Sequence, residues 1–291
     1  MIFEFMKANS AEFEIEKMAK IFKVSRAGYY RHINKKQSIR AQETKALTEK
    51  IKLIHKRHRE VYGSPRICAV LNKMGDKCSR KRVAKIMRQN NIQAKMRKVW
   101  KFTTKSFQRP SHLAPNLIKQ NFSASAKNKT WVSDITYVRT REGWLYVSAI
   151  LDLYSRTIVG LSMGDSIDSS LVIGSLKQAI CHRKPKAGLI VHTDRGCQYT
   201  SSEYQQFLSV HGIIPSMSAA GYCYDNAAME SFFHTLKTEL VYRCNFDTRK
   251  NAVSSIFEYV EVFYNRNRIH STLNYLSPLE FEQKNSLAVR I

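Results

Sequence analysis

The chain has 291 residues, of which 43% are hydrophobic and 11% aromatic, and it carries a formal net charge of +25. This hydrophobic content excludes an intrinsically disordered protein, and the length is sufficient for two or three domains. No stretch approaches the roughly 20 apolar residues of a membrane-spanning helix, and the N-terminus lacks the basic start and apolar core of a secretion signal. We therefore expect a cytoplasmic protein with no membrane partner.

The positive charge is concentrated in the first part of the chain. Residues 1–124 contain 30 Lys and Arg against 8 Asp and Glu, whereas residues 125–291 contain 18 against 15. A basic segment gains binding free energy from a polyanion because the phosphates release their counterions, so the asymmetry favours DNA or RNA as a ligand. A solvated, solubilising surface is the alternative interpretation. We expect a basic binding region followed by a near-neutral domain with a different task.

Two pairs of short helices are expected in the basic region. In the first pair, apolar residues recur at helical spacing from Ile15 to Phe22, and Ser25 is placed to cap a second helix that carries Arg26. A short second helix with basic residues is typical of a helix-turn-helix, in which that helix reaches the DNA. Arg26 is therefore a candidate DNA-binding residue.

The second helical pair has clearer boundaries. Ser64 is expected to cap a helix with Pro65 in its first turn, Gly75 can end that helix in the left-handed conformation, and Ser79 is placed to cap the next one. That next helix is amphipathic with a basic outer face. A plain helical hairpin is the alternative, but the basic second helix favours DNA contact. The candidate DNA-binding residues of this pair are Arg66, Arg80, Lys81 and Arg82.

After residue 128 the pattern changes from helices to strands. Runs of β-branched and aromatic residues predict three consecutive strands in an antiparallel meander, followed by helix, strand, helix, strand and helix. This order indicates a mixed α/β sheet with helices on its faces. The expected strands span residues 131–138, 144–153, 157–163, 188–192 and 213–217, and the expected helices span residues 169–182, 202–210, 225–240 and 251–264, before a last short helix that begins with a capping box at residue 277.

Three carboxylates lie in or next to elements that are expected to be buried, where a negative charge needs a positively charged partner. Asp134 lies inside the first strand, Asp194 ends the fourth, and Glu230 lies early in the helix after the fifth. Strands one and four are neighbours in the sheet that this order favours, so the two aspartates are expected to meet. Each acid alone has a structural explanation, as a turn, a cap or a partner of His234 or Lys237. Jointly they suggest a divalent cation, because hard cations prefer carboxylate oxygens.

The spacing of these acids and the motifs around them carry a family resemblance. Thirty-five residues separate Asp194 from Glu230, and with Asp134 upstream this resembles the Asp-Asp-35-Glu catalytic core of retroviral integrases and many bacterial transposases. The likeness is more specific to the orfB-type transposases of the third bacterial insertion-sequence family. The segments that carry it are Tyr62–Ile67, Trp131–Tyr137, His192–Tyr199, Cys223–Phe233 and Tyr264–Pro278.

This resemblance implies a ribonuclease H-like mixed-sheet catalytic core preceded by an all-α helix-turn-helix region. It also implies that Asp134, Asp194 and Glu230 are catalytic and hold two Mg²⁺ ions, for which Mn²⁺ can substitute. Lys237 matches a position that touches DNA near the active site, with a surface lysine as the alternative. The expected domains are a DNA-binding region at 1–105, a linker at 106–128, the core at 129–242 and a helical tail at 243–291.

The implied function is transposition: binding of element ends followed by Mg²⁺-dependent DNA cleavage and strand transfer. The implied partners are element-end and target DNA, further copies of the chain on DNA, and an upstream-frame orfA product, separate or fused by frameshifting, at the bacterial nucleoid. Asp152 competes as a third acid and is expected to be structural. Two alternatives stay open: a tyrosine recombinase, since His192 to Arg195 fits a His-x-x-Arg pattern, and a DNA-binding regulator with a decayed core.

Overall fold

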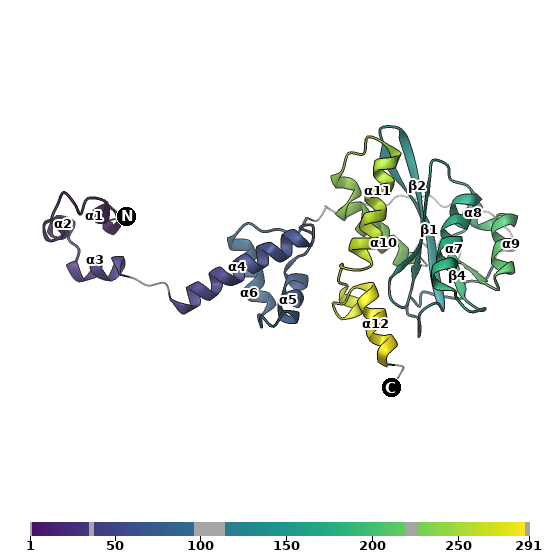
Figure 1. Cartoon of the computed structure of the whole chain (residues 1–291), viewed down its shortest axis with the longest axis horizontal. Coiled ribbons are helices and arrows are strands. Elements are labelled where there is room, and N and C mark those ends of the chain that lie inside the picture. Colours follow the sequence, from purple (N-terminus) through teal and green to yellow (C-terminus); the bar gives the residue numbers. More distant parts are fainter. Residues whose placement is uncertain (1, 35–37, 96–113, 219–225, 289–291) are drawn as a thin grey trace. The chain divides into compact units, whose positions relative to one another are not determined.

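The protein is described by a computed structural model, which covers residues 2–34, 38–95, 114–218 and 226–288 (Figure 1). The chain divides into two compact units, Met1–Leu53 and Ile54–Ile291.

The first unit is built from short helices. α1 (Ile2–Ala8), α2 (Ile15–Ile21) and α3 (Arg26–Ile33) pack around a small core, and α4 (Ile39–Arg57) begins in this unit. The cap predicted at Ser25 is confirmed, because its Oγ accepts a hydrogen bond from the Gly28 N–H at 3.0 Å. The helices α1 and α4 were not predicted. Polar residues make up most of α4, so its apolar stripe is weak in the sequence. The buried residues of this core are Met6, Met18, Ala19 and Tyr29.

The second helical pair opens the second unit. It consists of α5 (Ser64–Lys73) and α6 (Arg80–Gln89), and Ser79 Oγ caps α6 by accepting from the Arg82 N–H at 3.2 Å, as predicted. Gly75 follows α5 with a φ of +91°, which confirms the left-handed helix end. The predicted cap at Ser64 is wrong: the helix starts one residue earlier, with Gly63 at the N-cap position and no side-chain cap. Residues 96–113, which include the end of the expected DNA-binding region and the start of the expected linker, lie outside the described residues.

A five-stranded mixed sheet forms the centre of the second unit. β1 (Thr130–Thr140), β2 (Gly143–Asp152) and β3 (Ile158–Gly164) form the predicted antiparallel meander, and β4 (Ile190–Thr193) and β5 (Ile214–Met217) run parallel to β1. The strand order is β3-β2-β1-β4-β5. The prediction that strands one and four are neighbours is therefore confirmed.

Helices cover both faces of this sheet (Figure 1). α7 (Ser169–Arg183), α8 (Cys197–Thr200) and α9 (Ser202–Val210) lie on one side, and α10 (Ala227–Glu239) and α11 (Arg249–Glu258) lie on the other. The short helix α8 was not predicted. The inner stripe of α10 is buried, and the predicted mixed α/β sheet after an all-α region is confirmed. The buried stripe residues are Met229, Phe232, Phe233, Leu236 and Leu240.

The C-terminal segment adds shorter helical elements. A 3₁₀ turn, η2 (Val241–Arg243), follows α10, and α11 continues into a π-helical turn, η3 (Tyr259–Tyr264), before η4 (Ser271–Leu273) and α12 (Pro278–Ala288). The capping box of α12 is confirmed, since the Ser277 N–H donates to the Glu280 carboxylate at 3.0 Å and the Glu280 N–H donates to Ser277 Oγ at 3.4 Å. Ile256 and Val260 face the core of this segment, whereas Phe257 is 49% exposed.

A buried polar network joins this C-terminal segment to α10 and to the residues before α5. Arg268 and Glu239 form a salt bridge at 2.8 Å whose side chains are 6% and 8% exposed, and the Tyr259 hydroxyl donates to the same carboxylate at 2.7 Å. The Tyr62 hydroxyl donates to the Asn267 carbonyl at 3.0 Å and accepts from a backbone N–H of the tail at 2.9 Å. The end of α10 is thus fixed by two distant parts of the chain.

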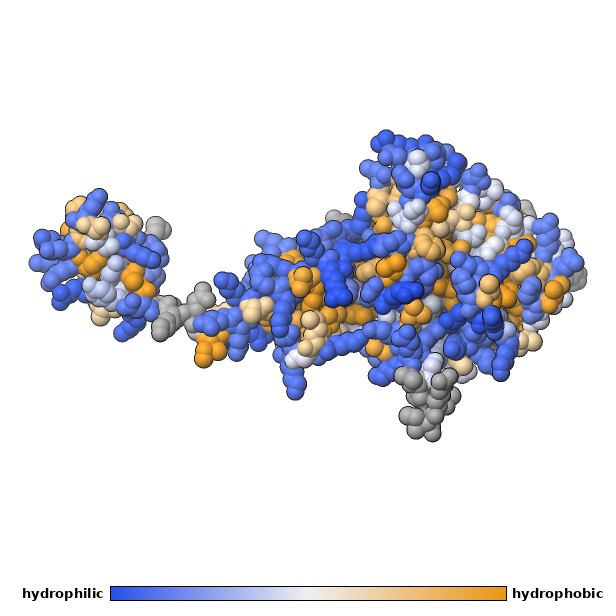
Figure 2. Space-filling model, viewed as in Figure 1, coloured by the Kyte–Doolittle hydropathy of each residue, from blue (hydrophilic) through white to orange (hydrophobic). Residues whose placement is uncertain are grey.

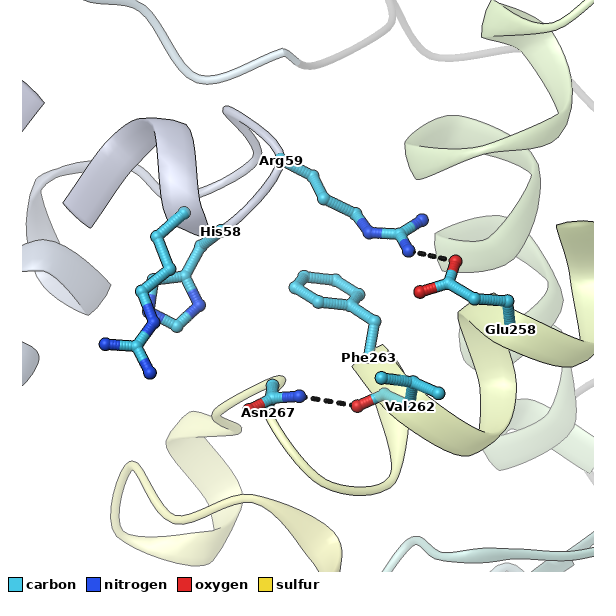
Figure 3. A pocket seen from close by; sticks show the side chains of 7 residues that line it. His58, Arg59, Glu258, Val262, Phe263 and Asn267 are labelled. Atoms are coloured by element: carbon cyan, nitrogen blue, oxygen red, sulfur yellow. Dashed lines mark hydrogen bonds and ion pairs between the residues drawn. The ribbon is translucent and has the colours of Figure 1, made fainter. Parts of the chain in front are cut away.

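A pocket lies beside this network (Figure 3). Arg59 pairs with Glu258, and its guanidinium lies 4.9 Å from the centre of the Phe263 ring. His58 stacks on Tyr62 at 4.2 Å, and burial lowers the pKa of His58 to about 4, so it is neutral at physiological pH. These contacts join the residues before α5 to the tail by packing as well as by hydrogen bonds. The pocket is lined by Arg57, His58, Arg59, Glu258, Val262, Phe263 and Asn267.

Candidate active site

Two aspartates lie just past the point where the parallel pairing of β1 with β4 ends, and Asp134 is still within β1. The pairing of β1 with β4 ends at Val132 and His192, so Asp134 lies two residues beyond it, and Asp194 directly follows β4. The charge of Asp194 acts on Asp134, and so does that of Glu230, which lies in the first turn of α10. The structure therefore brings the three predicted acids to one end of the sheet.

The ionisation of these carboxylates is opposed by their surroundings. Burial, and then the charge of Asp194, raise the pKa of Asp134 to about 7. The Ile135 N–H donates to Asp134 Oδ1 at 2.8 Å and offsets only part of this rise. Desolvation also raises the pKa of Asp194 and that of Glu230. Convergent carboxylates in this state would be stabilised by an added positive charge.

Asp194 is held by the turn that follows β4. Its Oδ1 accepts from the Gly196 N–H at 2.9 Å, and a Cβ at position 196 would lie 3.0 Å from that oxygen and 2.8 Å from Gln198 Oε1. A side chain at this position would therefore displace the carboxylate. The preceding His192 is fully buried, with ring nitrogens 2.9 Å and 3.1 Å from the hydroxyls of Ser216 and Ser218.

The start of α10 is tied directly to β1. Asn226 occupies the N-cap position, but the predicted side-chain cap is not formed. Its amide instead donates to the Ser133 carbonyl at 3.3 Å, one residue before Asp134, and Asp225 lies outside the described residues. Further along α10, the charge of Lys237 lowers the pKa of Asp134, and burial lowers the pKa of Lys237 itself. The helix thus places a carboxylate and a cation beside the same strand.

The donor chemistry of the three acids fits a hard divalent cation, since they offer only carboxylate oxygens. Within the described ranges, no three His, Cys, Asp or Glu side chains lie close enough together to hold a metal ion as they stand. Glu230 is exposed and Asp134 is half-buried, so enclosing an ion requires their side chains to move closer.

Asp152 has the partners that the three acids lack. It is fully buried, accepts from the N–H groups of Asn128 and Tyr154 at 2.8 and 2.9 Å, and pairs with Arg183 at 3.3 Å. Burial raises the pKa of Asp152, and the two N–H donors and Arg183 offset part of that rise. Because these partners hold the carboxylate inside the protein, Asp152 fits the structural role expected for it.

The candidate DNA-binding residues occupy different environments. At the start of α6, Arg80, Lys81 and Arg82 are exposed on the basic face of the helix. Arg26 pairs with a surface glutamate, Glu16, at 3.0 Å. Arg66 is half-buried, its guanidinium lies 5.5 Å from the centre of the Tyr62 ring, and burial lowers its pKa, so it contributes to packing. Hydrophilic residues predominate on the face of the molecule shown in Figure 2.

Two aromatic residues near the site had no assigned role in the sequence analysis. Tyr137 and Trp144 are 57% and 46% exposed on the β1–β2 hairpin, and the ring of Tyr137 lies under the Lys237 ammonium. The sequence signal that could have identified Tyr137 is its position: it is an aromatic residue on the outward face of a strand, three residues after a candidate catalytic acid.

Comparison with protein families finds three matches along the chain. An HTH-like domain matches residues 42–100, and two models described as integrase core domains match residues 124–223 and 230–286. No helix in the described part of the chain has the length and apolar character to cross a membrane.

Curated relatives match over nearly their full lengths. The chain is 39% identical over 290 residues to the transposase InsF for insertion sequence IS3A of Escherichia coli strain K12, which covers 98% of this chain and 99% of that protein. It is 44% identical over 254 residues to the transposase for insertion sequence element IS904 of Lactococcus lactis (87% and 100%). It is also 41% identical over 270 residues to an uncharacterized 31 kDa protein of insertion element IS600 of Shigella sonnei (92% and 98%).

Similar chains among solved structures come from retroviral integrases. One is the HTLV-2 integrase catalytic core domain in complex with magnesium, with a TM-score of 0.43, 18% identity, and coverage of 54% of this chain and 98% of that one. Another belongs to a simian T-cell lymphotropic virus intasome, with a TM-score of 0.46, 18% identity, and coverage of 80% and 74%.

Proposed function

This chain belongs to the insertion-sequence transposases with an integrase core, and we propose that it cleaves and joins DNA through Asp134, Asp194 and Glu230. The observation that carries the proposal is the convergence of acid charges on Asp134. Burial, Asp194 and Glu230 raise its pKa to about 7, whereas burial raises the pKa of the structural Asp152 against an arginine and two N–H donors that offset part of the rise. A protein retains such an arrangement where a function requires it.

A divalent metal is part of the proposal, with Mg²⁺ as the ion that the oxygen-only donor set favours and Mn²⁺ as a substitute. Asp134, Asp194 and Glu230 would together hold two such ions. Bound metal in such a site neutralises phosphate charge and lowers the pKa of the attacking water or hydroxyl.

The chain's own residues position the DNA in this mechanism. The paired strands β1 and β4 hold the two aspartates, α10 presents Glu230, and the Lys237 ammonium contacts a phosphate oxygen beside the scissile bond. Water attacks the phosphodiester at the element end, and the P–O bond to the 3′ oxygen breaks and leaves a 3′-hydroxyl. That hydroxyl then attacks a target phosphodiester in line, so one P–O bond forms as another breaks, without a covalent protein intermediate.

DNA binding by the basic region completes the proposal. The exposed Arg80, Lys81 and Arg82 on α6 contact element-end DNA, supported by the excess of 30 basic over 8 acidic residues in positions 1–124. The proposed domains are a DNA-binding region at residues 1–105, a linker at 106–128, the catalytic core at 129–242 and a helical tail at 243–291. Further copies of the chain and an upstream-frame orfA product act with it on nucleoid DNA.

The test is cleavage and joining of an element-end oligonucleotide in Mg²⁺. Asp134→Asn, Asp194→Asn and Glu230→Gln should each abolish both reactions and retain end binding. The matched control is Asp165→Asn, which changes an exposed acid after β3. A triad variant that still joins strands would refute the assignment.

Two other functions are separated by the same assay. A regulator with a decayed core would bind the oligonucleotide and never cut it. A tyrosine recombinase would still cut the oligonucleotide in EDTA, whereas the metal-dependent cleavage proposed here would stop. The structure disfavours the recombinase, because His192 of the His-x-x-Arg pattern is fully buried within the sheet.

A further inference from the structure

Two exposed aromatic side chains form a pair at the edge of the candidate active site. The rings of Tyr137 and Trp144 meet edge to face, with centroids 5.1 Å apart and planes at 85°. Both rings remain about half accessible to solvent, at 57% and 46%, whereas the tryptophan of the same sheet that serves the core, Trp131, is fully buried. This pair therefore adds little to the core and presents aromatic surface outward.

Basic side chains flank this pair. The Lys237 ammonium lies 4.8 Å from the centre of the Tyr137 ring, and the charge of the same ammonium acts on Asp134. On the hairpin, the exposed Arg139 is directly opposite Trp144, so the two side chains share one face with Tyr137. One end of the aromatic pair thus meets Lys237, which lies two helical turns after Glu230 on α10, and the other end borders a guanidinium.

The hairpin that carries the pair is held in place. Arg249 at the start of α11 donates from its Nε to the Trp144 carbonyl at 3.0 Å and from its N–H to the Glu142 carboxylate at 2.8 Å. Thr140 Oγ1 donates across the turn to the Gly143 carbonyl at 2.7 Å. A surface that is already ordered loses little entropy when a ligand binds.

We propose that Tyr137, Trp144, Arg139 and Lys237 form a stacking site for an unpaired DNA base next to the scissile phosphate, an inference that rests on the proposed function. Aromatic faces beside cations are the features with which proteins hold single-stranded DNA, where bases stack on rings and phosphates meet Lys and Arg. A base within a duplex is already stacked on its neighbours and has no free face to offer. The site therefore selects an end whose terminal base pairs have opened.

The experiment compares two element-end duplexes bound by the full chain in a Glu230→Gln background, which prevents cleavage. One duplex is fully paired, and the other carries three unpaired nucleotides at the end to be cut, with 2-aminopurine as the first of them. We expect the parent protein to bind the unpaired end roughly ten-fold more tightly and to quench the 2-aminopurine fluorescence. Equal affinity for the two duplexes without quenching overturns the proposal, whatever the variants do.

The variants then locate the effect. Trp144→Ala and Tyr137→Ala should bring the affinity ratio towards one and restore the fluorescence, and Trp144→Phe should retain both effects because it keeps a ring. Phe257→Ala is the matched control, since it removes a similarly exposed aromatic from α11. An unchanged ratio in both alanine variants overturns the proposal, as does competition by an acidic peptide alone, which would indicate a protein ligand. Failure of the triad would appear separately, as cleavage by Asp134→Asn.

Discussion

Replacement of Asp134 by Asn should stabilise the metal-free protein while it abolishes the reaction. Folding raises the pKa of Asp134 from 3.8 to about 7. Between these pH values the folded chain therefore keeps a proton that the unfolded chain has released. The protonated Asp134 carboxyl therefore contributes its full stability below pH 3.8, and this contribution is lost as the pH rises to about 7.

The size of the effect follows from the pKa shift. At about 1.4 kcal/mol per pKa unit, a rise from 3.8 to about 7 lowers the free energy of unfolding by at most about 4 kcal/mol above pH 7. Asparagine carries no charge, and its amide oxygen can still accept from the Ile135 N–H. In EDTA at pH 8 the variant should gain up to this amount, roughly 5–15 °C in the melting temperature of a unit of this size. At pH 5 the gain should shrink to about 1–2 kcal/mol, because the wild-type carboxyl is then protonated in the folded state.

The assay is thermal unfolding of wild type and Asp134→Asn at pH 5, 6.5 and 8, in EDTA and in Mg²⁺. Added Mg²⁺ should raise the melting temperature of the wild type and have little effect on the variant. The control is Asp165→Asn, whose melting temperature should match the wild type in every condition. Equal melting temperatures for wild type and Asp134→Asn at pH 8 in EDTA, or a gain that persists unchanged at pH 5, would refute the reasoning.

Three other outcomes test the structure. Glu239→Ala leaves Arg268 buried without its partner and should lower the free energy of unfolding by about 3–5 kcal/mol, measured by chemical denaturation. The control Lys73→Ala breaks an exposed ion pair and should lower it by less than about 1 kcal/mol. Equal losses in the two variants would contradict the burial of the Arg268–Glu239 pair. Tyr62→Phe removes the hydroxyl that serves one N–H and one carbonyl of the tail and should cost about 1–3 kcal/mol, measured by the same denaturation. The rate of DNA cleavage at limiting Mg²⁺ should fall as the pH drops below 7, because a carboxyl group must lose its proton to bind the metal. Added Mg²⁺ should restore the cleavage rate. A rate independent of pH between 5.5 and 7.5 would exclude Asp134 as a metal ligand.

Local elements were predictable where their signals lie within a few residues. The cap at Ser79, the helix end at Gly75 and the three strands of the meander all depend on contacts or periodicities within one turn or one hairpin. Where a signal was short or ambiguous, the prediction failed. The helices α1 and α8 have seven and four residues, and the Ser64 hydroxyl does not cap α5. The 19-residue helix α4 was also missed, because its sequence is largely polar.

By itself, the sequence determined the order of the five strands, the basic character of the first region, and the three acids with their spacing. Only the tertiary structure decided which charges meet. Asp134 and Asp194 meet where the pairing of β1 with β4 ends, and Arg268 pairs with Glu239 inside the protein. Arg66 packs on Tyr62, although its residue type favoured DNA contact. The physical reason is that caps and periodicity arise between neighbours in the chain, whereas the pKa of a carboxyl and the partner of an arginine depend on groups that folding brings together from far apart.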